Sequence, residues 1–537
     1  MRDAAKETLN KGKDHPFSHS LILDISCTLL FGVAVLLFFG LAYPHHLHYQ
    51  EQYQLFLFDT TYVWEIVKQP GGVADLLGRF CTQFFLYAWV GALIIALLLT
   101  AVQLLVLRLF TLHSSLNSQH STLNTQLSCG LSFVPSFLLW IFLLDENALL
   151  CGVWAVLLTL LVAWAIVKLT SGRMRYVLLI VAIPILYWIS GPVCFPIPID
   201  GLWHGIHYYR YPTVFPWLLW GAALSVFVLV IIGQTLLRPL PVREGSNYSS
   251  SKADAKVSTP LLHREGVGVG LLFLVAAVMG FLVWKNTNMK AEKVMQYDFM
   301  ARHQQWNRIL ETINAEKPNN QIGVTVQNLA LAMHGVLLDH LFDYHQNGIA
   351  GLLPDVKEDA TSPLPTAEAF YQLGMINVAQ RTVFEAQEAI LDFQKSGRCY
   401  KRLAQTNLIN GNYEVARKYL MALRKTLFYS EWANETLPLL GNEEAIAKHP
   451  EYGRLRQFAY KDDLTSSQTS SRSAISSELD DSRLTGDFYF SDHVTPEMLE
   501  SLYFSNTENQ LAYQYLLAYY MLTGDRESFN NFISKKR

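Results

Sequence analysis

Long runs of apolar residues fill the first part of the chain and constrain its fold more than any other feature. The first run, LILDISCTLLFGVAVLLFFGLAY at 21–43, is long enough to cross about 30 Å of hydrocarbon as a helix. Lipid offers the backbone no hydrogen-bond partners, so such runs fold as helices. Six further runs bring the prediction to about seven transmembrane helices; they lie at roughly 84–110, 130–144, 148–168, 176–195, 214–237 and 266–285.

A cleaved signal peptide is the competing interpretation of the first run. The apolar core of a signal peptide is shorter and ends in small residues at a cleavage site. The length of the run at 21–43 favours an uncleaved span.

The composition predicts a membrane half and a soluble half. The 537 residues are 51% hydrophobic and 16% charged, which is too apolar for a soluble protein and too polar for one that is all membrane. The formal net charge of -3 argues against a nucleic-acid partner, which requires a basic face. The six cysteines form no CxxC pair, so neither a zinc knuckle nor a redox pair is indicated.

Basic residues predict the orientation of the bundle. Lys and Arg gather in the tail at 1–20, in the loop after the fourth run and in the loop after the sixth run. Cytoplasmic loops carry such an excess. We therefore expect a multi-pass protein of the bacterial cytoplasmic (inner) membrane, with a cytoplasmic N-terminus and a periplasmic C-terminal domain. Two Ser/Asn-rich inserts at 113–128 and 244–260 are predicted to be solvated cytoplasmic linkers.

From residue 286 onward the pattern is helical and contains internal repeats. LGMINVAQRTVFEA and INGNYEVARKYLMAL match each other and the tetratricopeptide pattern, and LLAYYMLTGDRESFNNFI repeats the helix–Gly–helix form around Gly524. Such repeats stack into a solenoid with a concave face. The sequence therefore predicts a tetratricopeptide-like domain at 286–537, interrupted by a Ser-rich disordered loop near 464–483.

The stretch at 44–83 is too polar to cross a bilayer and too apolar for a free loop. TTYVWEIVKQ and VADLLGRFCTQFF each predict a short amphipathic helix, and Pro70-Gly71-Gly72 separates the two. Helices of this kind lie in the membrane interface or simply cap the bundle. We expect this first outer loop to be interfacial.

The same loop supplies the candidate catalytic residues. Glu51 or Asp59 would serve as a general base or metal ligand beside a lipid phosphate, and Arg210 would hold that phosphate. The simpler interpretation of Glu51 and Asp59 is solvated loop charge. For Asp59, which precedes a predicted helix, it is also helix N-capping. For Arg210, the simpler interpretation is an anchor for the sixth span.

His204 and His207 are the other candidate substrate-binding residues. They fall on the same predicted side of the membrane as His45, His46 and His48. Imidazoles ligate divalent ions when they converge, but interfacial polar residues explain the pattern more simply. We assign no metal site and no cofactor, except a divalent metal if the protein is a transferase. The chain contains no Walker loop, HExxH or GxSxG motif.

Two segments carry a resemblance to known families. EQYQLFLFDTTYVWEIVKQPGGVADLLGRFCTQFF, continuing into FLYAWVGALIIALLL, and LGMINVAQRTVFEAQEAILDFQKSGRCYKRLAQTNLINGNYEVARKYL resemble an uncharacterised family of polytopic membrane proteins in Bacteroidota. That resemblance implies an envelope location and supplies no activity. In architecture the chain is also similar to GT-C membrane glycosyltransferases, which place an acidic loop with interfacial helices after the first span. Those enzymes often carry adjacent acids in that loop, whereas Glu51 and Asp59 stand apart here.

Together these features predict an all-α protein with three parts. They are a cytoplasmic tail at 1–20, a transmembrane bundle at 21–285 and an extracytoplasmic helical-repeat domain at 286–537. The expected function is that of a non-enzymatic envelope protein that contacts membrane lipids and binds an envelope protein through its repeat domain. The alternative is a GT-C-like transferase with a lipid-linked sugar or phospholipid donor at the outer membrane–water interface. The sequence leaves open whether the protein is an enzyme.

Overall fold

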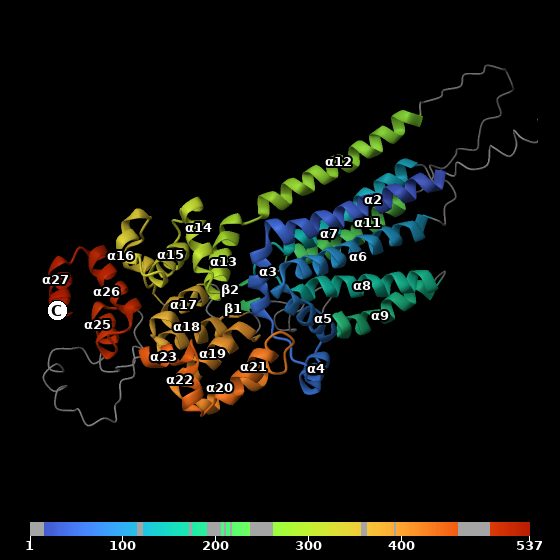
Figure 1. Cartoon of the computed structure of the whole chain (residues 1–537). Coiled ribbons are helices and arrows are strands. Elements are labelled where there is room, and N and C mark those ends of the chain that lie inside the picture. Colours follow the sequence, from blue (N-terminus) through green and yellow to red (C-terminus); the bar gives the residue numbers. More distant parts are fainter. Residues whose placement is uncertain are drawn as a thin grey trace, which may run out of the picture. The chain divides into compact units, whose positions relative to one another are not determined.

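The computed structural model describes residues 16–114, 122–170, 174–190, 206–208, 211–214, 217–236, 261–355, 362–390, 394–459 and 494–536. The described chain is helical apart from one two-stranded sheet, formed by β1 (Ile206–Tyr208) and β2 (Tyr211–Val214) (Figure 1). It divides into two compact units. The first comprises Met1–Gln50, Thr60–Ile206 and Thr213–Met289, and the second comprises Glu51–Asp59, His207–Pro212 and Lys290–Arg537.

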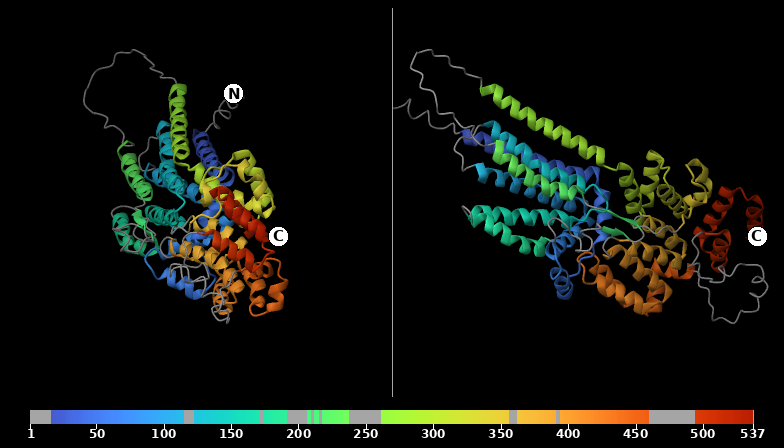
Figure 2. Two further views of the ribbon diagram at one scale, coloured as in Figure 1. Left: turned by 90° about the vertical axis from the view of Figure 1, so that its left-hand side faces the viewer. Right: turned by 180° about the vertical axis from the view of Figure 1, so that it is seen from behind.

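The helices of the first unit are mostly long. They are α2 (Pro16–Leu37), the π-helix η1 (Phe38–Ala42), α3 (Pro44–Gln50), α4 (Thr60–Val67), α5 (Gly72–Thr82), η3 (Gln83–Leu86), α6 (Ala88–Ser114), α7 (Thr122–Phe142), α8 (Leu150–Leu169), α9 (Met174–Ser190), α11 (Trp217–Leu236) and α12 (Leu261–Asn286). Figures 1 and 2 show α2, α6, α7, α8 and α11 running side by side as a bundle. An aromatic cluster lies in its core, where the Phe137 and Trp140 rings stack 5.9 Å apart and both contact Phe31.

Each of the seven predicted spans falls on a helix of the first unit. Three helical stretches are long and apolar enough to cross a membrane: Ile22–Ala42, Ala88–Phe110 and Leu150–Leu169. Shorter apolar stretches lie within α7, α11 and α12. The count of seven spans stays a prediction.

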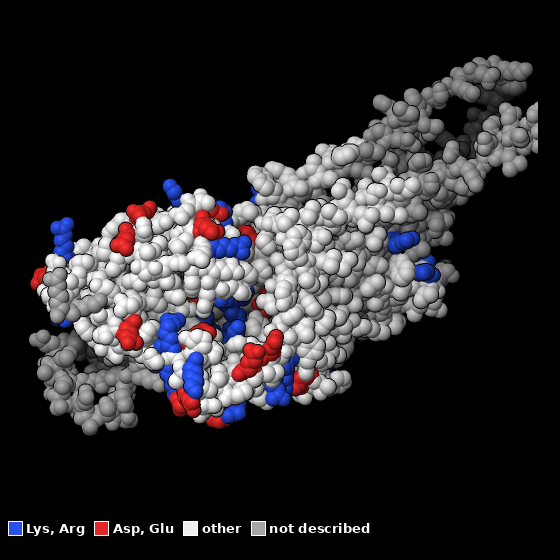
Figure 3. Space-filling view, in the orientation of Figure 1, with Lys and Arg blue, Asp and Glu red and all other residues white. Residues whose placement is uncertain are grey.

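The surface of the first unit is apolar. Large side chains point outward, with Leu30 71%, Phe273 73% and Trp284 72% exposed. Figure 3 shows that the visible face of its long helices carries almost no Lys, Arg, Asp or Glu among the described residues, except for basic side chains at one end. A surface of this kind suits contact with lipid rather than with water.

The two short helices predicted after the first span are present as α4 and α5. Helix α5 packs against α8 at Gly78, where a Cβ atom would lie only 2.7 Å from the backbone nitrogen of Cys151. The predicted linker at 113–128 is partly wrong, because α7 already begins at Thr122. The residues after 128 are apolar and continue this helix into the core. The polar first turns of the helix precede them.

The second unit is built from shorter helices. They are η2 (Glu51–Tyr53), α13 (Met289–Arg302), α14 (Trp306–Glu316), α15 (Gln321–Met333), α16 (Leu337–His340), η4 (Leu341–Asp343), η5 (Gly348–Gly351), α17 (Pro363–Leu373), α18 (Ile376–Glu388), α19 (Gly397–Asn410), α20 (Tyr413–Leu423), α21 (Ser430–Thr436), η7 (Leu437–Leu439), α22 (Glu443–Lys448), α23 (Tyr452–Phe458), α25 (Pro496–Ser505), α26 (Gln510–Thr523) and α27 (Arg526–Lys536). The predicted loop near 464–483 lies outside the described residues.

The three predicted helix–Gly–helix segments are helical hairpins. Gly374 joins α17 to α18, Gly411 joins α19 to α20 and Gly524 joins α26 to α27. All three adopt left-handed backbone angles, with φ of 92°, 81° and 72°. Glycine reaches this region without the steric cost that a Cβ imposes, so it ends one helix and turns the chain into the next.

Residues Glu51–Asp59 belong to the second unit although they lie some 230 positions before most of it. The backbone N–H of Leu55 donates to the carbonyl of Lys395 (2.8 Å), and that of Phe58 donates to the carbonyl of Lys425 (2.7 Å). The Leu55 side chain joins a small core that includes Ala404 and Leu420. The sequence pattern places all of 44–83 in one loop, whereas the structure divides that stretch between the two units.

Candidate functional site

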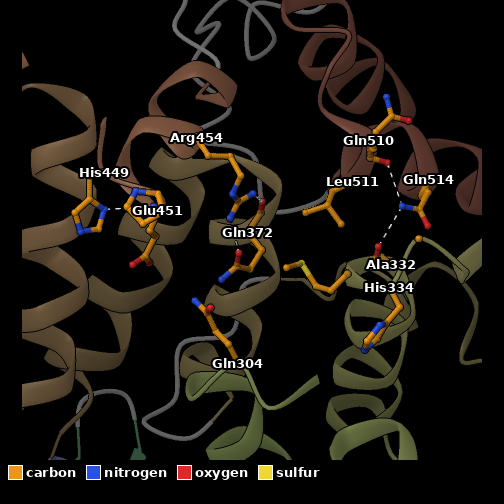
Figure 4. Close-up of a pocket in the computed structure, with 13 residues that line it drawn as sticks. Gln304, Ala332, His334, Gln372, His449, Glu451, Arg454, Gln510, Leu511 and Gln514 are labelled. Atoms are coloured by element: carbon orange, nitrogen blue, oxygen red, sulfur yellow. Dashed lines mark hydrogen bonds between the residues drawn. The ribbon is translucent and has the colours of Figure 1, made fainter. Parts of the chain in front are cut away.

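A cavity of about 700 Å³ opens in the second unit. The turns around α13, α15 and α23 supply part of its lining, and α17 and α26 supply the rest (Figure 4). The lining residues are Gln304, Ala332, Met333, His334, Gly335, Gln372, His449, Pro450, Glu451, Arg454, Gln510, Leu511 and Gln514.

Glutamine amides dominate the polar part of the lining, and two of them are held by hydrogen bonds. Gln372 Oε1 accepts from Arg454 Nη2 (2.8 Å), and Gln372 Nε2 donates to Glu368 (3.0 Å). Gln514 Nε2 donates to the carbonyls of Ala332 (3.1 Å) and Gln510 (3.3 Å), as Figure 4 shows. These amides are fixed in orientation, so the cavity wall has a defined pattern of donors and acceptors.

His449 and Glu451 form one corner of the cavity. His449 Nδ1 accepts from the backbone N–H groups of Glu451 (3.3 Å) and Tyr452 (3.2 Å), and its ring stacks 4.0 Å from that of Tyr452. A neutral ring whose Nδ1 accepts must carry its proton on Nε2. Glu451 Oε1 accepts from the Tyr371 hydroxyl (2.9 Å).

A row of cations on α19 lies next to the cavity. Arg398, Lys401 and Arg402 are spaced three and four residues apart, so they share one face of the helix. Arg398 forms a bidentate ion pair with Asp298, with distances of 2.6 and 2.7 Å. Arg402 pairs with Glu368 and lies over the Tyr371 ring at 3.6 Å. Both arginines are largely buried, with 9% and 15% of the side chain exposed.

The predicted catalytic acid Glu51 is 4% exposed and lies in the second unit. Its Oε1 accepts from the Tyr429 hydroxyl (2.9 Å), and its Oε2 is buried without a hydrogen-bond partner. Burial raises the pKa of Glu51, and the nearby charge of Arg302 partly opposes this rise. A carboxyl in such surroundings holds its proton more tightly than one in water.

The second predicted acid, Asp59, lies at the other end of the same segment. It forms an ion pair with Lys425, which is four residues before Tyr429 in the chain. Glu51 and Asp59 thus contact two positions in the α20–α21 connection, and each has its own partner there.

The remaining predicted site residues lie partly outside the described chain. His204 and Arg210 fall outside it, and His207 lies in β1 with a side chain that the structure does not describe. In α3, the Nδ1 atoms of His45 and His48 lie 3.3 Å apart, while buried His46 contacts the Leu143 carbonyl through Nε2 at 2.8 Å. Burial lowers the pKa of His46 to about 4.

Among the described residues, no group of three or more His, Cys, Asp or Glu side chains is arranged to hold a metal ion. The polar groups that do converge are amides, guanidinium groups and carboxylates. They suit hydrogen bonding and charge recognition rather than ligation of a metal ion.

The comparisons with known proteins identify a family and no activity. The model of a family of unknown function, DUF6057, matches residues 19–537. The chain belongs to this family. No curated protein and no solved structure matches the chain. The family thus spans both units and leaves the function to be argued from the cavity and its surroundings.

Sequence reasoning missed the cavity and the cation row, although one signal was available. The segment GRCYKRLAQ places Arg398, Lys401, Arg402 and Gln405 at helical spacing on a single face. A charged stripe of this kind is usually a solvated helix face. Here the charged face of α19 is buried by helices α13 and α17, which lie more than 20 residues away in the chain. No local sequence pattern indicates that these helices pack against it.

Proposed function

We propose that this member of the family is a membrane protein whose second unit binds an extended segment of a partner protein in the cavity. The observation that carries the proposal is the amide-rich lining of that cavity. A peptide backbone presents one N–H donor and one carbonyl acceptor at each residue. A glutamine amide offers both complements in one group, so an array of them can hold a backbone of varied sequence.

The size and lining of the cavity support this proposal. A volume of about 700 Å³ lies within the roughly 300–1,000 Å³ that is typical of ligand sites. Leu511, Met333 and Ala332 add an apolar wall, which suits a side chain of the bound segment. Recognition of an extended segment in a helical groove is a common mode for domains of stacked helical hairpins.

We place the protein in the bacterial cytoplasmic membrane, with about seven spans, a cytoplasmic N-terminus and a periplasmic second unit. Its membrane half contacts lipid, and the second unit is a tetratricopeptide-like domain. Support comes from the three long apolar helices and from Arg108, Lys168 and Arg175, which lie near the ends of α6, α8 and α9. The glycine-linked hairpins support the repeat assignment.

Site-specific photo-crosslinking in the native host tests the binding proposal on the full chain. A photoreactive phenylalanine replaces His334 or Gln510, which are exposed and line the cavity. The matched control carries it at Glu435, an exposed position on α21 outside the lining. We expect protein adducts at His334 and Gln510 that map to one continuous segment of one partner, and none at Glu435.

A synthetic peptide of the mapped segment must then suppress both adducts. Adducts only with lipid or glycan, or equal labelling at all three positions, would contradict peptide binding.

The second candidate function is the transferase, and one observation favours it. Glu51 is a buried carboxyl with a raised pKa and an oxygen that has no hydrogen-bond partner, as expected of a general acid or base. Its 4% exposure favours the binding proposal instead, since a lipid-linked donor must reach the reacting atom. Under this alternative Asp59, Arg210, His204 and His207 complete the site, with or without a divalent metal.

Glycan and lipid profiling of the host envelope separates the two candidates. A deletion strain is compared with Glu51→Gln and Asp59→Asn strains at normal protein level. Loss of the same glycan or lipid species in the deletion and in either variant supports the transferase. A deletion phenotype that both variants rescue supports peptide binding.

A further inference from the structure

The cations beside the cavity are not all ion-paired among the described residues. Four carboxylates lie near them: two form ion pairs with arginines, and two accept from tyrosine hydroxyls. Asp298 pairs with Arg398, Glu368 pairs with Arg402, Glu451 accepts from Tyr371 and Glu51 accepts from Tyr429.

Lys401 is the clearest cation without an anionic partner. It forms no ion pair in the described chain, and its ammonium lies 5.0 Å from the centre of the Trp432 ring. Burial lowers the pKa of Lys401 and the positive charge of Arg402 lowers it further, while the charges of Glu451 and Glu368 partly oppose this fall. An additional anion beside Lys401 would reduce the repulsion between the neighbouring cations.

Arg302 and Arg402 also have unused hydrogen-bonding groups. Arg302 Nε is buried without a partner, and its guanidinium lies 5.5 Å from the Phe299 ring. Arg402 uses one nitrogen for Glu368, while its Nη1 is buried without a partner. A buried guanidinium N–H with no acceptor costs free energy that an oxyanion would recover.

Arg302, Lys401 and Arg402 are each partly exposed to solvent, and they lie beside the cavity lining. Two cavity residues also touch the partners of Arg402. Gln372 donates to Glu368, which pairs with Arg402. Glu451 accepts from Tyr371, and the Tyr371 ring lies under the Arg402 guanidinium.

We infer that Arg302, Lys401 and Arg402 form a subsite for an oxyanion, a carboxylate or a phosphate group, on the ligand of the neighbouring cavity. The statement that this oxyanion belongs to the ligand of the cavity rests on the proposed function. The subsite itself does not, because its affinity for a small oxyanion can be measured without the partner. A bound peptide would present the carboxylate of an acidic residue beside the segment that the amides hold.

Thermal unfolding of the full chain in a maltoside detergent, whose headgroup is uncharged, tests the subsite. The probes are glutarate and inorganic phosphate, each compared with chloride at equal ionic strength. A ligand that binds only the folded state raises the midpoint, and above its dissociation constant the rise grows with the logarithm of its concentration. We expect one of the two oxyanions at tenfold its dissociation constant to raise the midpoint by about 4 °C above chloride.

The variant Lys401→Met keeps the apolar stem over Trp432 and removes the charge, so most of that shift should disappear. Lys401→Arg should retain it, and so should the control Lys418→Met, which alters an exposed lysine on α20. A response to glutarate identifies a carboxylate, and a response to phosphate identifies a phosphate group.

If neither oxyanion raised the midpoint of the wild-type protein above that in chloride, the inference would be overturned, whatever the variants do. An undiminished shift in Lys401→Met would overturn it as well. Loss of the photo-crosslinks with an intact oxyanion response would contradict only the peptide proposal.

Discussion

The two units bury polar groups in different ways. In the first unit the most deeply buried polar side chains include no Asp, Glu, Lys or Arg among the described residues, and the Arg79–Asp75 ion pair keeps 17% and 20% of its side chains exposed. Thr28 Oγ1 donates to Gln103 Oε1 (3.1 Å), and Gln103 Nε2 donates to Ser132 Oγ (3.0 Å). In the second unit the interior groups include full charges, such as the bidentate pair of Asp298 and Arg398.

This difference follows from what surrounds each unit. The first has an apolar surface suited to lipid, so helices gain little from burying apolar side chains against each other, and neutral hydrogen bonds and aromatic packing orient them. The second has a polar surface and many short helices. Buried charges there contribute little net stability, so their arrangement is better explained by recognition and by specification of one packing.

The largest effect is expected from Arg398→Met. It leaves the Asp298 carboxylate in a largely buried site without its partner, a change that costs about 3–5 kcal/mol. The free energy of unfolding of the second unit, from denaturant titration of the full chain, measures this loss. The control Arg424→Met removes an exposed arginine from the same unit and should change stability little. Equal stability of the two variants would show that the buried pair is dispensable.

In the first unit, Gly78→Ala should have an intermediate effect. The new methyl group would lie 2.7–2.8 Å from Cys151 atoms, so α5 must move away from α8. Overpacking of this kind costs about 1–3 kcal/mol. Hydrogen exchange of peptides from α5 and α8 should become faster. Gly280→Ala, which meets nothing within 4 Å, is the matched control. Unchanged exchange in Gly78→Ala would contradict the close packing.

The helices were predictable from the sequence because their signals are local. Apolar runs marked the helices of the first unit, and Gly374, Gly411 and Gly524 marked the hairpin turns. The partners of the candidate residues were not predictable. Asp59 and Lys425 are 366 residues apart, and Glu51 and Tyr429 are 378 apart. No periodicity reports such a pairing, because it depends on how distant helices pack.

A smaller effect is expected from Gln103→Leu in the first unit. It removes the hydrogen bonds that join Thr28 to Ser132 through Gln103. Such interhelical bonds are worth about 0.6 kcal/mol on average in membranes. The thermal midpoint of the first unit in detergent should fall slightly. This loss of stability should be much smaller than the loss that Arg398→Met causes in the second unit. If Gln103→Leu lowered stability as much as Arg398→Met, the contrast between the two units would be contradicted.

The smallest effect is expected from Glu51→Gln, and it should depend on pH. The pKa of Glu51 is raised on folding, so the folded state binds this proton more tightly than the unfolded state. The stability of the wild type should therefore fall as pH rises from the unfolded pKa through the folded one. Glu51→Gln should lose that dependence, whereas Glu431→Gln at an exposed position should keep it. If Glu51→Gln were less stable than the wild type at high pH, ionised Glu51 would stabilise the fold, and the expectation would be wrong.

Occupancy of the cavity in native membranes tests the central claim most directly. Gln510→Cys is labelled with a maleimide in envelope membranes and, separately, in purified protein, with Glu435→Cys as the control and the wild type as the blank. We predict that Gln510→Cys reacts several-fold more slowly in membranes than after purification, because the partner covers it, while Glu435→Cys reacts equally in both. Equal rates for Gln510→Cys in the two samples would contradict a bound partner.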